Sequence, residues 1–379
     1  MSASIKKRYA KTFYKQRDLP QPRQEFWPAD SGELLEVLAN PGLDAPLLLL
    51  GDGQHVRPAV LGERVFDVVR TESCRRVLSV DRESKLARVE CGIRWGDLQD
   101  ELRERGLSLE RSGLNPRNST IGGLLGRHHG VGRELWDGDI RTSCIALSGF
   151  TPTDGQYGYL PAPRKASGPD MRYLFIGGEG FLGAILDATF VVWRPSEARL
   201  FRWEVAAHEA MIVHQKMLDL GIQIAWASYV AGTLNVAVFA ADGVLRSIER
   251  EVAPLKPTDT GGRDDVTILR NSLEAAHPDR RESATAKQTH RAVFSTEHAG
   301  QVLESFANAD VEIWDLTRHR ATFYATYPKG KVPAELPGDI AQLAHSQRLV
   351  ASDGVVHWSQ WSQTLKNELD RDRRLAVGP

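Results

Sequence analysis

The first half of the chain alternates between short apolar runs and helically spaced apolar residues. The run at residues 46–50 is bounded by turn residues, so it predicts a buried strand that ends at Gly51-Asp52-Gly53. Ahead of it, residues 28–31 offer an N-cap for a helix whose apolar residues continue until residues 40–42 end it. Further elements are expected at residues 65–69 (strand), 77–80 with 86–91 (antiparallel strands), 95–105 (helix) and 181–194 (extended), whereas residues 111–162 are glycine-rich and predict loops and short strands.

The pattern changes after residue 196 into two rounds of strand, helix and strand, which predict a small α+β domain with helices over an antiparallel sheet. The uncharged stretch Gly221–Ala241 is long enough to suggest a membrane span. Polar residues interrupt it every few positions, so two strands around a turn at 231–233 explain it better. The other expected elements are a strand at 201–206, a helix at 208–220, a long connection at 252–288, and a second round at 292–295, 297–308 and 311–327.

Length and composition agree with a two-domain globular protein. The chain has 379 residues, of which 41% are hydrophobic and 26% charged, and this balance excludes wholesale disorder or a fibrous repeat. The formal net charge of −1 hides a basic arm: residues 1–24 hold seven lysines and arginines against Asp18 alone, a charge of +6, which leaves −7 for the rest. The arm either contacts phosphate or an acidic membrane surface, or is a solvated terminus, and it lacks the apolar region of a signal peptide.

The cysteines Cys74, Cys91 and Cys144 lie 17 and 53 residues apart. They form no CxxC or Cys/His motif, which disfavours structural zinc, iron–sulfur clusters and a disulfide framework. This cysteine usage favours a reducing compartment. We therefore expect a cytoplasmic protein without a transmembrane segment, a metal site or a nucleic-acid partner.

Residues 178–183 spell GxGxxG, the spacing of a dinucleotide-binding fingerprint, and they follow the strand-like residues 173–176. That fingerprint requires a helix after the third glycine, because the pyrophosphate binds at the helix N-terminus. The residues that follow here are β-rich and end at a proline, so we reject a Rossmann site. Glycines also cluster at 51–53 and 119–138, and this density indicates backbone that passes close to a flat ligand.

In order and spacing, these segments resemble the FAD-linked oxidases of the vanillyl-alcohol oxidase and p-cresol methylhydroxylase type, and within them the FAD-binding subunits of glycolate or D-lactate oxidases. The resemblance rests on residues 28–34, 50–53, 89–98, 118–125, 178–185 and 365–379. It implies an α+β fold with a two-subdomain FAD-binding domain and a smaller α+β cap. The implied limits are 1–24 for the basic arm, 25–197 for the FAD-binding domain, 198–345 for the cap or substrate domain, and 346–379 for a C-terminal segment that returns to the FAD-binding domain.

The resemblance also implies which residues hold FAD. They are a diphosphate loop at Gly51, Asp52, Gly53, Gln54 and His55, a continued contact at Thr120, Gly122 and Gly123, and an adenosine contact at Gly183 and Ile185. Members with covalently attached flavin place a histidine where this chain has Gln54, so we expect a non-covalent FAD. The metal-binding histidine motif that many 2-hydroxy-acid members carry in the cap is absent from this sequence.

Candidate catalytic bases are histidines in the glycine-rich loop and in the cap. His129 ranks first and His128 second, because this adjacent pair lies beside Arg127 and Arg133 in the segment that the resemblance places along the cofactor; His319 ranks third. An imidazole can take a hydroxyl proton while an arginine holds a carboxylate. The alternative is that the loop pair contacts phosphate or solvent and that His319 belongs to a solvated basic edge strand.

The implied activity is that of an FAD-dependent oxidoreductase, an oxidase or dehydrogenase that oxidises a small hydroxylated or 2-hydroxy-acid substrate by hydride transfer to the flavin. Electrons would then pass to oxygen, a quinone, or a partner protein such as an electron acceptor or sister subunit. The alternative is a non-catalytic FAD-binding subunit of a multi-subunit oxidase or dehydrogenase.

Overall fold

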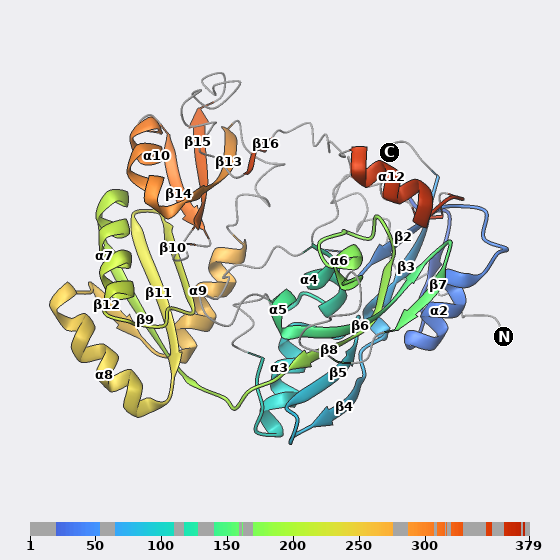
Figure 1. Ribbon diagram of the computed structural model, residues 1–379, viewed down its shortest axis with the longest axis horizontal. Coiled ribbons are helices and arrows are strands. Elements are labelled where there is room, and N and C mark those ends of the chain that lie inside the picture. The colour runs from blue at the N-terminus through green and yellow to red at the C-terminus, as the bar shows by residue number, and fades with distance from the viewer. Residues whose placement is uncertain are drawn as a thin grey trace.

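The chain forms two lobes, which Figure 1 shows in blue to green and in yellow to orange. The computed structural model describes residues 20–53, 65–109, 117–127, 140–158, 161, 170–275, 287–306, 309–314, 316, 320–328, 346–350, 360–372 and 374–375. The N-terminal lobe holds a three-stranded and a five-stranded sheet, and the second lobe holds one eight-stranded sheet. Helices accompany all of these sheets, so the fold is α+β as expected from the sequence.

The three-stranded sheet is parallel and has the order β1-β3-β2. Its strands are β1 (Glu25–Phe26), β2 (Leu47–Leu50) and β3 (Asp67–Arg70). Between β1 and β2 lies α2 (Ser31–Ala39), whose first turn is capped by Asp30, since the Asp30 carboxylate accepts from the backbone N–H groups of Gly32 and Glu33. The predicted buried strand and the predicted helix cap are both confirmed.

The five-stranded sheet is antiparallel and has the order β4-β5-β8-β6-β7. Its strands are β4 (Val77–Asp81), β5 (Leu86–Glu90), β6 (Cys144–Thr151), β7 (Gly155–Gly158) and β8 (Ala184–Val191). A short 3-10 turn, η2 (Thr71–Ser73), follows β3 and leads to β4. The helices of this lobe are α3 (Trp95–Glu104), α4 (Ile121–Arg127), α5 (Ile140–Ser143) and α6 (Arg172–Phe175).

Two expectations for this lobe were wrong. The glycine-rich region 111–162 contains α4 and the eight-residue strand β6, which is buried along its whole length. Gly149 lies within β6, where a Cβ would come 2.6 Å from the Phe175 ring. This glycine therefore makes room for the Phe175 ring and does not mark a loop. Residues 173–176, which looked strand-like, belong mostly to the short helix α6.

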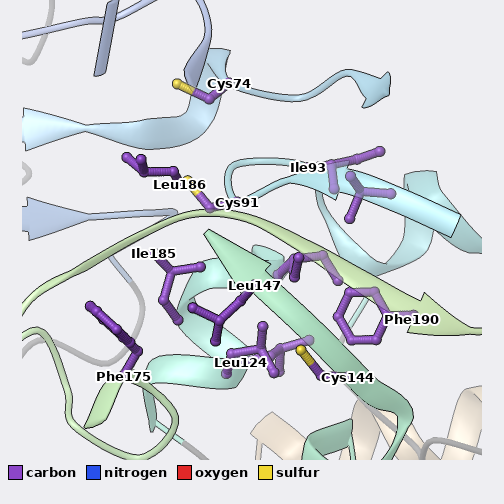
Figure 2. Packing of buried hydrophobic residues seen from close by; sticks show 14 of the residues in the cluster. Cys74, Cys91, Ile93, Leu124, Cys144, Leu147, Phe175, Ile185, Leu186 and Phe190 are labelled. Atoms are coloured by element: carbon purple, nitrogen blue, oxygen red, sulfur yellow. The ribbon is translucent and has the colours of Figure 1, made fainter. Parts of the chain in front are cut away.

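Figure 2 shows the core of this lobe, in which Cys91 and Cys144 pack among aliphatic and aromatic side chains of β6, β8 and α4. All three cysteines are buried and free. Burial raises the pKa of the Cys74 and Cys144 thiols to about 12. The cysteines therefore act as small apolar core residues.

The eight-stranded sheet of the second lobe has the order β12-β9-β11-β10-β14-β15-β13-β16, and all of its pairs are antiparallel. The uncharged stretch forms a hairpin in which Ala231 and Gly232 both have positive φ, as a two-residue turn of this hand requires. The predicted hairpin is confirmed. The strands are β9 (Glu197–Glu204), β10 (Trp226–Val230), β11 (Thr233–Ala240), β12 (Asp259–Gly261), β13 (Lys287–Ser295), β14 (Asp310–Trp314), β15 (Arg320–Pro328) and β16 (Ser346–Val350).

Alternate residues of β9 pack into clusters on the two faces of this sheet. Phe201 and Trp203 join the cluster under α7 (Ala207–Asp219), α8 (Asp242–Val252) and α10 (Ala299–Ser305). Ala198 and Leu200 join the cluster that includes Val266 and Leu273 of α9 (Arg263–Ala275). Short 3-10 turns, η4 (Ala253–Leu255) and η6 (Thr296–His298), complete the lobe.

The prediction of a long connection at 252–288 was wrong, because this segment contains β12 and α9. Val266, Leu269 and Leu273 follow the i, i+3, i+7 spacing of a helix face, and this signal was hidden by the charged residues around it. Among the described helices, none is long and apolar enough to cross a membrane.

The last helix, α12 (Gln360–Leu369), lies on the N-terminal lobe, where Figure 1 draws it in red. Leu365 and Leu369 pack against a cluster that includes Leu48, Phe181 and Leu182. Leu375 then forms a parallel bridge with Leu47. The end of the described chain thus extends the sheet that carries β2.

Candidate functional site

The first glycine-rich segment, Gly51-Asp52-Gly53, follows the carboxyl end of β2. Gly53 has a φ of 66°, a conformation that favours glycine. Gly51 packs directly against Thr120, because a Cβ at position 51 would overlap the Thr120 hydroxyl and methyl groups. The structure therefore brings together two segments that the sequence separates widely.

Thr120 is held by the turn between β5 and α3. Its backbone forms an antiparallel bridge with Arg94, and the neighbouring Trp95 N–H donates to the Ser119 carbonyl oxygen over 2.8 Å. On the other side, the Ile121 N–H donates to the Ile93 carbonyl oxygen over 2.9 Å. These bonds fix the start of α4 beside the loop at 51–53.

Gly122 and Gly123, which the sequence treats as equivalent, have different surroundings. A Cβ at Gly122 would lie 3.0 Å from the Cys91 Cβ and 3.1 Å from the Cys91 carbonyl oxygen, and the Gly122 N–H donates to that oxygen over 2.7 Å. Of the atoms in the described residues, a Cβ at Gly123 would meet only the Thr120 hydroxyl, at 3.0 Å, and Gly123 is exposed. Gly122 thus serves protein packing, whereas Gly123 faces open space.

The third glycine-rich segment, residues 178–183, joins the same assembly through the end of α4. The Gly177 N–H donates to the Leu125 carbonyl oxygen over 2.9 Å, and the Glu179 N–H donates to the Gly126 carbonyl oxygen over 2.8 Å. Residues 184–191 then form β8, so the rejection of a Rossmann site is confirmed.

Gly183 and Ile185 have packing roles in this lobe. A Cβ at Gly183 would lie 2.5 Å from the Phe150 carbonyl oxygen and 2.6 Å from the Phe175 ring. Ile185 belongs to the hydrophobic core and is buried. A contact of these two residues with adenosine stays a prediction.

Charged side chains surround the loop at 51–53. The Arg94 Nη2 atom lies 3.1 Å from the Asp52 Oδ1 atom, and the Arg70 Nη2 atom lies 2.5 Å from the Glu72 Oε1 atom. Burial raises the pKa of Glu72, and repulsion by Asp52 adds to that effect while Arg70 and Arg94 oppose it. The carboxylates of Asp52 and Glu72 and the guanidinium groups of Arg70 and Arg94 therefore form one cluster of interacting charges at this loop.

These surroundings fit a flavin dinucleotide, whose diphosphate needs donors and close backbone approach. The Ser119 hydroxyl, beside Thr120, is buried and has no hydrogen-bond partner among the described residues. The open side of Gly123 leaves room for a ligand that a side chain would fill. A diphosphate or ribityl hydroxyl group would satisfy such an orphaned hydroxyl.

Several predicted site residues lie outside the described residues: Gln54, His55, His128, His129, Arg133 and His319. Arg127 is the last residue of α4. Sequence reasoning did not single out Arg94, Arg70 or Glu72 as site residues. Arg94 directly precedes the predicted helix at Trp95, but its approach to Asp52 depends on the tertiary packing of the turn after β5 against the loop after β2.

Comparisons with known proteins agree with this geometry. A sequence profile described as an FAD binding domain matches residues 22–157. The structure superimposes on that of alkyldihydroxyacetonephosphate synthase with a TM-score of 0.69 and 15% sequence identity, over 94% of this chain and 77% of that one. At this identity the likeness shows the fold.

Curated relatives match parts of the chain. An alkyldihydroxyacetonephosphate synthase of Caenorhabditis elegans is 23% identical over 46% of this chain, and an uncharacterized FAD-linked oxidoreductase of Escherichia coli (strain K12) is 27% identical over 34%. A mitochondrial L-galactono-1,4-lactone dehydrogenase of Oryza sativa subsp. japonica is 34% identical over 30% of this chain. The matches span only 30%, 26% and 18% of those three proteins.

Three lines of observation thus coincide: the contact of the loop at 51–53 with Thr120, the profile match and the shared fold. The loop that the resemblance assigned to the FAD diphosphate lies inside the matched residues. The N-terminal lobe of this chain is therefore an FAD-binding domain of the FAD-linked oxidase family.

Proposed function

We propose that the protein is an FAD-dependent oxidoreductase that oxidises a small hydroxylated or 2-hydroxy-acid substrate. The observation that carries the proposal is the contact of Gly51 with Thr120, with the orphaned Ser119 hydroxyl and the open face of Gly123 on the same segment as Thr120. The third glycine-rich segment joins them through its hydrogen bonds to the end of α4. The names of two relatives, an FAD-linked oxidoreductase and an L-galactono-1,4-lactone dehydrogenase, support redox chemistry on hydroxylated compounds.

The residues that would hold FAD are the backbone of Gly51, Asp52 and Gly53, the Ser119 and Thr120 hydroxyl groups, and the backbone of Gly123. When bound, the flavin supplies a two-electron acceptor for a hydride. The attachment is non-covalent in this proposal, because Gln54 stands where tethered relatives have a histidine.

The protein's own chemical task is to accept the substrate hydroxyl proton. His129 and His128 are the first candidates for this base, and His319 is the third. A positioned imidazole accelerates a reaction that needs proton transfer by about 10²- to 10⁴-fold. Arg127 or Arg133 would hold a substrate carboxylate through paired N–H donors.

Anaerobic reduction of the bound flavin tests the proposal. The purified chain is mixed with glycolate, D-lactate or L-galactono-1,4-lactone, and bleaching of the flavin absorbance is followed. We expect at least one compound to bleach the flavin, and His129→Ala to slow that step by about 10²-fold or more. His319→Ala alone slowing the step would move the base to the second lobe.

A flavoprotein that no hydroxylated compound bleaches would favour the second candidate, a non-catalytic FAD-binding subunit. The sequence feature behind this candidate is the missing histidine motif of many 2-hydroxy-acid oxidases. Addition of an iron–sulfur or flavoprotein partner would then be needed before substrate could reduce the flavin.

A further inference from the structure

The loop proposed to receive the diphosphate carries a carboxylate of its own. Asp52 stands between two glycines, and about a fifth of its side chain is exposed. Backbone N–H groups in such a loop attract a dianion, but an ionised carboxylate among them repels it, and the repulsion is strong where water is partly excluded. The loop therefore needs a positive charge that offsets Asp52.

Arg94 is placed to supply that charge. Its Nη2 atom lies 3.1 Å from the Asp52 Oδ1 atom, and its backbone is fixed by the bridge to Thr120. Because the same residue pairs with Thr120 through its backbone and with Asp52 through its side chain, it connects the two glycine-rich segments. Loss of the guanidinium would leave the bridge in place and remove only the charge.

The charges of Glu72 and Arg70 make the net charge beside the loop depend on Arg94. Glu72 also interacts electrostatically with Asp52 and with Arg94, while Arg70 pairs with Glu72 at 2.5 Å. With all four groups charged the cluster is neutral, and without Arg94 it carries one net negative charge beside the loop. Such a charge opposes the approach of a diphosphate.

We propose that Arg94 is an electrostatic positioning residue for the cofactor: it neutralises Asp52 and holds the loop at 51–53 in register with Thr120, so that the loop can accept a dianion. This inference rests on the proposed FAD site and concerns cofactor affinity, not the chemistry of the substrate. It assigns a role to a side chain that belongs to neither glycine-rich segment.

The test is a double-mutant cycle on the FAD dissociation constant, measured by flavin fluorescence on apoprotein. Arg94→Gln should weaken FAD binding about tenfold, which is about 1.4 kcal/mol. Asp52→Asn should tighten FAD binding, because the carboxylate that repels the diphosphate is gone. The double variant should bind FAD more tightly than Arg94→Gln, with a constant near the wild-type value, because the charge to be neutralised is gone. The effect of Arg94→Gln should shrink at high salt.

Arg105→Gln is the matched control. Arg105 is about as exposed as Arg94 and pairs with Glu101 at the far end of α3. The Arg105→Gln variant therefore removes the same charge at a place away from the loop. Thermal unfolding of each apoprotein shows whether a variant has lost its fold. Wild-type affinity in Arg94→Gln, or a double variant as weak as Arg94→Gln, would overturn the inference, whereas a wild type that binds no FAD would overturn the proposed function itself.

Discussion

The Nζ atom of Lys366 lies 2.7 Å from the Asp370 Oδ2 atom, and both side chains are buried. The ammonium group also donates to the Phe181 carbonyl oxygen over 2.7 Å, while the Asp370 carboxylate accepts from the backbone N–H groups of Arg374 and Leu375. The pair therefore ties α12 both to the glycine-rich segment at 178–183 and to the residues that extend the sheet beside β2.

Removal of the Lys366 charge should destabilise the protein. Lys366→Met leaves the Asp370 carboxylate buried without its counter-ion, and breaking such a pair lowers the free energy of unfolding by about 3 kcal/mol. Urea unfolding measures the change. Arg371→Met breaks an exposed pair with Glu368 at the end of the same helix and should leave the midpoint unchanged. Equal midpoints for the two variants would contradict this reading of the buried pair.

Alanine at Gly122 and at Gly123 should have different consequences. At Gly122 the new methyl group presses on Cys91, which we expect to lower the free energy of unfolding by about 1–3 kcal/mol. At Gly123 the described part of the chain brings only the end of the Thr120 side chain near the methyl group, so stability should change little while the FAD dissociation constant rises about tenfold.

Gly126→Ala is the control for both variants, because a Cβ at Gly126 meets no described residue within 4 Å. It should retain wild-type FAD affinity and fold at least as stably as the wild type. Chemical unfolding and flavin titration together separate the two roles. FAD binding by Gly123→Ala with wild-type affinity would show that this face does not approach the cofactor.

Acid should destabilise the second lobe through His214 of α7. Burial lowers the pKa of His214 to about 4, and its Nε2 atom has no hydrogen-bond partner among the described residues. The folded protein therefore holds His214 neutral while the unfolded chain binds a proton near pH 6.5. The stability from this residue is complete above pH 6.5 and is lost as the pH falls toward 4, by up to about 3 kcal/mol.

His214→Leu should flatten that dependence between pH 6.5 and 4, as measured by urea midpoints across the range. His208→Leu, an exposed histidine on the same helix, is the control. If wild type and His214→Leu lose stability in parallel on acidification, the dependence comes from other groups.

Flavin should leave the protein on acid precipitation. Gln54 replaces the tethering histidine of covalent relatives, so a yellow supernatant over a colourless pellet is expected. Absorbance of the two fractions near the flavin maximum measures the split. A yellow pellet would establish a covalent link through another residue, and a preparation colourless from the start would contradict FAD binding.

The sequence by itself determined the elements that contiguous residues encode. Asp30 caps its helix, a two-residue turn at 231–232 closes its hairpin, and the strand at 47–50 ends in the expected glycine loop. These features depend on neighbours in the chain, so local spacing and turn chemistry suffice to predict them. The order of the glycine-rich segments likewise sufficed to indicate the FAD-linked oxidase family.

Only the tertiary structure decided which of those residues meet. The contact of Gly51 with Thr120, the pairing of Arg94 with Asp52, and the separate roles of Gly122 and Gly123 all depend on tertiary packing. The turn between β5 and α3 and the start of α4 come together with the loop after β2. Glycine spacing alone gives the same pattern for a packing glycine and a ligand-facing one. The difference lies in what a Cβ would touch, and residues far apart in the sequence supply those neighbours.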